Sequence, residues 1–309
     1  MKVLVTGGAG FIASHIVDAY LTSGHKVVIV DNLTTGQEIN INPKAQFYKL
    51  DIRDQELLEI IRKEKIEVVS HQAAQVDIRR SVLDPVYDAS VNILGSINLL
   101  EACVKTGVKH FIFASTGGAI YGEQSYFPAD ETHPLNPMSP YGITKLTLEK
   151  YLSYYSNTYN LTYTALRYGN VYGPRQNPKG EAGVVAIFCE QMLAGKTPII
   201  NGNGKQTRDY IYVGDVVKAN LLALENYQTV FNQAFNIGTG IETDVIAIFK
   251  TLQDELKTDY EQTHAAAKAG EQRRSVLNIN KAKEKLGWQP TVDLKIGFHK
   301  TVKFYQEKL

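Results

Sequence analysis

The chain has little cysteine and almost no net charge. Only two of its 309 residues are cysteines, Cys103 and Cys189, and they form no CxxC pair. A disulfide framework is therefore excluded, and we expect a reducing compartment such as the cytoplasm. The 33 basic and 32 acidic residues leave a formal net charge of +1, which excludes a general attraction to nucleic acid or to an anionic membrane.

Long apolar runs and metal-binding spacings are missing as well. No apolar stretch approaches the roughly 18 residues that span a bilayer, so no membrane anchor is expected. The start, Met1-Lys2-Val3, runs directly into a predicted strand and is unlike a signal peptide. The seven histidines show no HxxH or HxxxH spacing, and no metal site is predicted.

The most informative feature that is present is a glycine-rich turn. Residues 6–13 read TGGAGFIA and follow the apolar run Val3-Leu4-Val5. This pattern is typical of a buried strand that feeds a helix. Glycines let the backbone turn sharply and approach a ligand, and the helix start offers unpaired N–H groups to a diphosphate. A lone glycine turn also fits a strand–turn–helix unit that binds nothing.

An acidic residue in the right place favours the nucleotide. The apolar run Val27-Val28-Ile29-Val30 ends in Asp31, about 20 residues after the glycine turn. A carboxylate at this distance accepts hydrogen bonds from the adenosine ribose and repels a 2′-phosphate. The sequence therefore predicts NAD as the cofactor and argues against NADP.

Strand-like and helix-like segments alternate through the first half of the chain. We expect strands at 46–50, 68–71, 111–115 and 161–167, and helices at 54–62, about 85–105 and from Ser139 onward. Such alternation predicts an α/β fold with a doubly wound parallel sheet of the Rossmann type, covered by helices on both faces. Ligands should then bind where the strands end at their carboxyl edge.

From about residue 171 the alternation stops, and prolines, glycines and asparagines become frequent. Residues 235–238 look like one more buried strand that returns to the sheet. We therefore expect an NAD-binding domain formed by 1–170 with about 213–239. A smaller, discontinuous α/β domain formed by 171–212 and 240–309 would bind the substrate.

The pair Tyr141 and Lys145 carries the predicted chemistry. Ser139 can cap a helix and Pro140 suits its first turn, so Tyr141 and Lys145 share one helical face. A neighbouring ammonium favours the phenolate form that a basic tyrosine needs. With 18 tyrosines, about one Tyr-x-x-x-Lys pair is expected by chance, but this pair lies where a nucleotide-binding fold would need it.

Over essentially its whole length the sequence resembles the extended short-chain dehydrogenase/reductase family. The matching residues are 6–13, Asp31-Asn32-Leu33, Asp51-Ile52, His71-Gln72-Ala73-Ala74, Asn92, Tyr121-Gly122, 141–145 and 167–174. Two further segments, 208–213 and Leu286-Gly287-Trp288, resemble its UDP-glucose 4-epimerase branch. The resemblance implies that NAD is held by Gly7, Gly10, Phe11, Ile12, Asp31, Asn32, Asp51, Ile52, Gln72, Ala73, Ala74, Asn92, Tyr141, Lys145 and Tyr168.

The resemblance also implies a reaction, namely NAD-dependent 4-epimerisation of a UDP-sugar through a transient 4-keto sugar. Tyr141 would take the proton of the sugar O4, and Lys145 would hold the nicotinamide ribose. The residues implied for the diphosphate, uridine and sugar are Asn170, Arg175, Arg208, Lys268 and Ser275. A homodimer is implied too, formed by the helix of Tyr141 and the long helix at about 85–105.

The sequence departs from the family pattern at one catalytic position. A serine or threonine usually stands four residues before Tyr121, and Gly117 occupies that place here. Thr116 is the nearest hydroxyl and becomes the predicted partner of the sugar O4. The alternative is that Tyr141 works without a hydroxyl partner.

Two rival functions are weighed against 4-epimerisation. A nucleotide-sugar 4,6-dehydratase or decarboxylase is one, but the dehydratases of this family carry an Asp-Glu pair where this chain has Gly118-Ala119. A non-catalytic NAD-sensing protein is the other, and it would need neither Tyr141 nor Lys145.

The sugar that is accepted depends on one further position. A tyrosine there would confine the family's enzymes to UDP-glucose and UDP-galactose, and a small residue would admit N-acetylated sugars. Ser275 stands at this position, which predicts acceptance of both groups of sugar.

Overall fold

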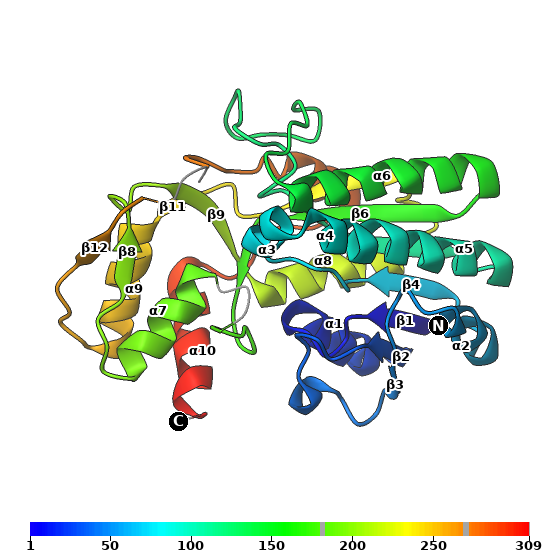
Figure 1. The fold of residues 1–309 in the computed structure, drawn as a ribbon, viewed down its shortest axis with the longest axis horizontal. Coiled ribbons are helices and arrows are strands. Elements are labelled where there is room, and N and C mark those ends of the chain that lie inside the picture. The colour runs from blue at the N-terminus through cyan, green and yellow to red at the C-terminus, as the bar shows by residue number, and fades with distance from the viewer. Residues whose placement is uncertain (180–182, 268–271, 309) are drawn as a thin grey trace.

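The computed structural model describes residues 1–179, 183–267 and 272–308. Its centre is a seven-stranded sheet with the strand order β10-β6-β5-β4-β1-β2-β3 (Figure 1). All six neighbouring pairs in this sheet are parallel. The strands are β1 (Lys2–Thr6), β2 (Lys26–Asp31), β3 (Gln46–Lys49), β4 (Val68–His71), β5 (His110–Thr116), β6 (Thr162–Tyr168) and β10 (Gln233–Ile237). The predicted doubly wound parallel sheet is confirmed.

Helices cover both faces of this sheet. One face packs against α1 (Phe11–Thr22) and α8 (Val213–Glu225), which contribute Ile16 and Val216 to one buried core. The other face packs against α2 (Glu56–Glu64), α5 (Ser96–Thr106) and α6 (Pro140–Tyr159), which contribute Leu57, Leu99 and Leu148 to a second core. Figure 1 shows α5 and α6 side by side over the sheet.

The long helix predicted at about 85–105 is built from three consecutive segments. These are α4 (Pro85–Ala89), a π-helical stretch η2 (Ser90–Gly95) and α5, and the short α3 (Ile78–Leu83) precedes them. A π-helical turn inserts one extra residue per turn, which shifts the face on which later side chains lie. Hydrophobic spacing alone does not reveal such a shift, so the sequence predicted one regular helix.

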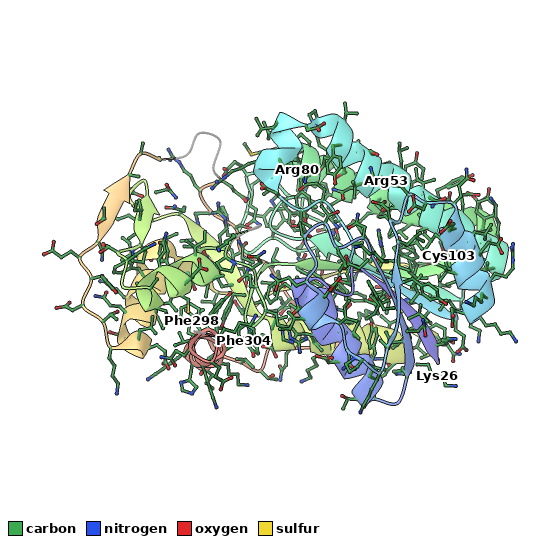
Figure 2. All side chains as sticks on the ribbon, turned by 60° about the horizontal axis from the view of Figure 1, so that its bottom comes forward. Lys26, Arg53, Arg80, Cys103, Phe298 and Phe304 are labelled. Atoms are coloured by element: carbon green, nitrogen blue, oxygen red, sulfur yellow. The ribbon has the colours of Figure 1, made fainter. Side chains whose placement is uncertain are left out.

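The second half of the chain adds two small sheets on the other side of the molecule (Figure 1). One contains β7 (Asn170–Tyr172), β9 (Thr207–Tyr212) and β11 (Glu242–Asp244), and the other β8 (Ile199–Asn201) and β12 (Thr263–Ala265). They surround a third core with α7 (Val184–Leu193), α9 (Val245–Leu256) and α10 (Leu294–Gln306), which holds the fully buried Phe298 (Figure 2). Two short segments, η1 (Glu38–Asn40) and η3 (Ala282–Leu286), complete the description.

Strand register brings the predicted site residues to one edge of the large sheet. Thr6 pairs with both Val30 and His71, His71 pairs with Phe113, and Thr116 pairs with Tyr168. The strands β1, β2 and β4 therefore end within one residue of one another, and β5 and β6 continue about three residues further along the same edge. The chain order reverses between β1 and β4, which is where ligands bind in open sheets of this kind.

Candidate functional site at the carboxyl edge of the sheet

The turn after β1 has the geometry that a diphosphate needs. Gly7 adopts a φ of +70°, and a Cβ there would stand 2.8 Å from the backbone of Ala73. Gly10 precedes α1, and no side chain caps this helix start or places an acid in its first turn. The N–H groups of Phe11 and Ile12 thus belong to a helix start that suits an anionic group. A side chain at Gly10 would meet the carbonyl oxygen of Gly7 at 3.0 Å.

The carboxylate of Asp31 stands beside this turn. It accepts the N–H of Ala9 at 3.0 Å and that of Leu33 at 2.8 Å. Asp31 is only 7% exposed, and burial raises the pKa of its carboxyl while the two N–H donors oppose that rise. Gly36 lies against the same carboxylate, since a Cβ there would stand 2.9 Å from both oxygens.

Asp51 lies at the end of the next strand and pairs with an arginine. Its oxygens accept Arg53 Nε at 2.8 Å, Arg53 Nη2 at 2.9 Å and Asn32 Nδ2 at 2.7 Å. The hydrogen bond from Arg53 lowers the pKa of Asp51 to about 2. Ile52 is buried beside it and packs against Gly95 of η2. The structure thus brings Asn32, Asp51 and Ile52 together near the end of β2.

A chain of hydrogen bonds crosses the switch point between β1 and β4. Thr6 Oγ1 accepts the N–H groups of Gln72 and Ala73, each at 3.2 Å, and lies 2.7 Å from His71 Nδ1. His71 Nε2 lies 2.8 Å from Ser96 Oγ, which donates to a backbone carbonyl. Burial lowers the pKa of His71 to about 3, so its ring is neutral at physiological pH, and its two nitrogens link Thr6 to Ser96.

Three predicted cofactor residues, Gln72, Asn92 and Tyr168, take part in further hydrogen bonds among amides and hydroxyls. Tyr168 Oη donates to Gln72 Oε1 at 3.3 Å and accepts Asn220 Nδ2 at 2.8 Å. The Asn92 amide bonds to both backbone groups of Gln75, with each bond at 2.8 Å, and Asn92 is 3% exposed. Asn92 therefore holds the segment after β4, in which half-buried Ala74 lies, against η2.

Tyr141 and Lys145 meet the end of β5. As predicted, Ser139 caps α6 by accepting the N–H of Gly142 at 3.2 Å, and Pro140 occupies the first turn. Lys145 is 4% exposed, and its Nζ donates to the carbonyl of Ala114 at 2.9 Å. The same Nζ lies 5.8 Å from the centre of the Tyr141 ring. A Cβ at Gly142 would stand 3.0 Å from the carbonyl of Ala119, so only glycine lets Tyr141 approach this loop.

The packing explains why glycine stands at position 117. A Cβ on Gly117 would come within 2.6 Å of Leu277, whose side chain is fully buried. The hydroxyl that the family pattern places there has no room. A Cβ on Gly118 would stand 3.8 Å from Thr116 Oγ1 and 3.4 Å from Asn170 Oδ1. The structure therefore brings Thr116 and Asn170 to the same side of the loop.

A buried ion pair beneath this site was missed by the sequence reasoning. Glu149 and Arg167 are joined by bonds of 3.0 and 2.7 Å, with side chains 9% and 5% exposed. Glu149 Oε1 also accepts the hydroxyl of Ser115 at 2.6 Å, and Arg167 donates to Tyr121 Oη at 2.9 Å. Glu149 follows Lys145 by four residues on the same helical face, which is the signal that could have found it.

Arg208 and Ser275 adjoin one another through β9. Arg208 Nη1 donates to the carbonyl of Thr207 at 2.8 Å, and the same carbonyl accepts the N–H of Ser275 at 3.2 Å. Asp209, also missed from the sequence, is buried and accepts the N–H of Thr239 at 2.6 Å and that of Leu277 at 3.2 Å. It thereby fixes β9 to the segment that contains Ser275.

Two predicted substrate residues remain, Arg175 and Lys268. Arg175 forms an ion pair with Asp18 of α1, in which Nη2 and Oδ2 are 2.7 Å apart. Lys268 lies outside the described residues.

The described residues contain no group of three or more His, Cys, Asp or Glu side chains that could hold a metal ion. In that same part of the chain, no helix is both long and apolar enough to cross a membrane.

Comparison with known proteins assigns the family. The model of the NAD dependent epimerase/dehydratase family matches residues 3–238. The chain belongs to this family. The resemblance to the extended short-chain dehydrogenases/reductases is thereby confirmed, and its cofactor is NAD, as Asp31 predicted.

Individual relatives match along the whole length. A putative UDP-glucose 4-epimerase of Methanocaldococcus jannaschii is 52% identical over 97% of both chains. The structure of the Thermotoga maritima UDP-glucose 4-epimerase with UDP-glucose is 50% identical, with a TM-score of 0.97 over 100% of this chain and 99% of that one. That of the Thermus thermophilus UDP-glucose 4-epimerase with NAD is 44% identical, with a TM-score of 0.95 over 100% of both chains.

Proposed function

We propose that this protein catalyses the NAD-dependent 4-epimerisation of a UDP-sugar through a transient 4-keto sugar. The observation that carries the proposal is that Lys145 Nζ, which lies near the ring of Tyr141, bonds to the carbonyl of Ala114 in β5. This bond lies two residues before Thr116, at the edge of the sheet where the NAD turn lies. The full-length match to UDP-glucose 4-epimerases supports the same reaction.

In this proposal the protein moves one proton and holds two ligands. The Tyr141 phenolate takes the proton of the sugar O4 and later returns it to the same oxygen. Lys145, fixed by the Ala114 carbonyl, keeps a positive charge near the Tyr141 ring and holds the nicotinamide ribose. Thr116 orients O4, while Asn170 and Arg208 bind the diphosphate and uridine. The buried Arg167–Glu149 pair supports this arrangement from beneath by holding Ser115.

The residues around the glycine turn fit NAD. Gly7, Gly10, Phe11 and Ile12 would hold its diphosphate, and Asp31 its adenosine ribose. Asn32, Asp51, Ile52, Gln72, Ala73, Ala74, Asn92 and Tyr168 would complete the cofactor site. When bound, NAD supplies hydride acceptance and return at the sugar C4, so a completed cycle consumes no cofactor.

The decisive experiment incubates the purified protein with UDP-galactose and no added cofactor, with NMR of the sugar. We expect UDP-glucose to form until equilibrium is reached, because the protein retains its NAD from expression. Denaturing the same preparation should release NAD into the supernatant. Loss of a water molecule from the sugar would identify a dehydratase instead. An unchanged sugar, with NAD present in the supernatant, would support an NAD-sensing protein.

The structure gives a reason to prefer epimerisation over dehydration. Dehydratases of this family carry acids at the positions of Gly118 and Ala119. The surroundings of Gly118 here are a hydroxyl and an amide, from Thr116 and Asn170. Within 4 Å of a Cβ at Gly118, the part of the chain that the structure describes offers no carboxylate to move protons at C5 and C6 of the sugar.

Ser275 is proposed to set the size of the sugar. It is 2% exposed and stands on the segment that pairs with Thr207, next to Arg208. A serine leaves room for an acetamido group, which a tyrosine ring would exclude by overlap. We expect the wild-type protein to act on both UDP-galactose and UDP-N-acetylglucosamine, and Ser275→Tyr to lose mainly the second, as measured by NMR of each sugar. A wild-type protein that leaves UDP-N-acetylglucosamine unchanged would contradict this assignment.

The proposal also covers the domain boundaries, the oligomeric state and the cellular compartment. The NAD-binding domain would comprise 1–170 with about 213–239, which is supported by β10 lying in the large sheet. The substrate domain would comprise 171–212 and 240–309. We also propose a homodimer that works in the cytoplasm, where the two free, buried cysteines stay reduced.

A further inference from the structure

We propose that Asp18, on the outer face of α1, holds the segment 32–44 closed over the adenosine half of the NAD site, and that Arg175 locks Asp18 in this role. The inference rests on the proposed retention of NAD. It assigns a function to a half-buried helical face that the reaction itself does not use.

Asp18 joins three segments that are distant in sequence. Its Oδ1 accepts Asn42 Nδ2 at 2.7 Å, and its Oδ2 pairs with Arg175 Nη2 at 2.7 Å. Hydrogen bonds to an ionised carboxylate are stronger than those between neutral groups. One turn earlier on the same helical face, His15 Nε2 bonds to the carbonyl of Pro174 at 2.9 Å. The outer face of α1 thus binds both the segment after β2 and the loop after β7.

The segment that Asn42 anchors reaches directly to the cofactor turn. Asn40 is 9% exposed and donates from Nδ2 to the carbonyl of Ala9 at 3.2 Å, and the N–H of Gln37 donates to the same carbonyl at 3.0 Å. Gly36 lies against the carboxylate of Asp31. A nucleoside whose ribose is bonded to Asp31 is therefore bordered by this segment. In this proposal, the nucleoside leaves when the segment moves away.

Arg175 has a strained backbone conformation at this junction. Arg175 adopts a φ of +68°, in the left-handed region that side chains other than glycine seldom occupy. It lines a cavity of about 470 Å³ together with Asp18, Asn40, Asn42 and Lys44. Its Nη1 is buried and makes no hydrogen bond to the residues that the structure describes. The ion pair with Asp18 holds the Arg175 side chain against α1 and links the second half of the chain to the helix that follows the NAD turn.

The test measures the release of NAD. Protein loaded with NAD is diluted into an alcohol dehydrogenase and ethanol, which reduce every released NAD, and the absorbance of the reduced nicotinamide is followed. We expect Asn42→Ala to release NAD about 10-fold faster than wild type, because one charge-assisted bond is lost. Arg175→Met should also release it faster. Added NAD should restore the epimerase activity that dilution removes from Asn42→Ala.

Asn203→Ala is the matched control. Asn42 and Asn203 each accept the N–H of the lysine two residues later at 3.0 Å, and Asn42 alone of the two donates to Asp18 among the described contacts. Asn203→Ala should release NAD at the wild-type rate. Equal release by Asn42→Ala and wild type, or equal acceleration by both alanine variants, would overturn the proposal. Slow release from a protein that fails to epimerise would instead overturn the proposed function and leave the role of Asp18 standing.

Discussion

In the proposed reaction, the hydroxyl of Tyr141 transfers the proton to and from the sugar O4. We expect Tyr141→Phe to lower turnover by at least about 100-fold, because removal of a general acid–base group typically costs this much. The NAD content of the variant should match that of wild type, since Lys145 keeps its bond to Ala114. Tyr151→Phe, on the same helix, is the control for a lost phenol hydroxyl. Turnover of Tyr141→Phe near the wild-type rate would exclude the assigned role.

A substitution at Thr116 tests whether its hydroxyl replaces the serine or threonine hydroxyl that the family usually has at position 117. We expect Thr116→Val to lower turnover by about 10-fold, since the hydroxyl only orients the sugar O4 and transfers no proton. The substitution keeps the shape of the side chain and its strand position opposite Tyr168. Steady-state rates on UDP-galactose provide the measurement. Full activity in this variant would favour the alternative, in which Tyr141 works without a hydroxyl partner.

At the scale of single residues, sequence patterns showed where functional residues lie, but they did not show why a particular residue occupies its position. Asp31 and Lys145 could be predicted because short spacings along the chain place them. Gly117 could only be seen as a departure from a pattern. Its cause is Leu277, a side chain 160 residues later in the sequence that fills the space of a Cβ. Contacts of this kind depend on the folded chain and leave no local signal.

At the scale of elements, α6 carries both the proposed catalytic residues and Glu149, which forms a buried ion pair with Arg167. We expect Glu149→Gln to lower the free energy of unfolding by about 3 kcal/mol or more, because Arg167 would keep a buried charge without a carboxylate partner. Urea unfolding followed by circular dichroism measures this loss. Glu59→Gln, which breaks an exposed pair with Arg62, should leave the unfolding midpoint unchanged. An unchanged midpoint in Glu149→Gln would show that the pair contributes nothing net.

Apart from α3 and the division of the helix at about 85–105, elements of the first half were predicted within a few residues, because alternating strands and helices each carry a clear hydrophobic period. Capping also helped, since Ser139 and Pro140 mark the start of α6. The small sheets of the second half could not be predicted. The strands β7, β8, β11 and β12 have three residues each, too few to display a period of two. Their pairing depends on distant partners such as Asp209, which fixes Leu277 beside β9.

At the scale of the whole molecule, the exposed apolar side chains of α4, η2 and α6 favour the proposed homodimer. Val86 is 78% exposed, Leu94 62%, and Ile143 and Tyr154 50% each, on elements that pack against one another. Apolar groups gathered on one surface are typical of an interface between subunits.

We expect light scattering to give about twice the 34.4 kDa mass of the chain. Leu94→Asp should shift this mass toward that of the monomer, because association would bury a carboxylate. Ile241→Asp is the matched control, since Ile241 is 65% exposed but lies next to β11 in the second half. A wild-type mass of one chain at micromolar concentrations would reject the dimer.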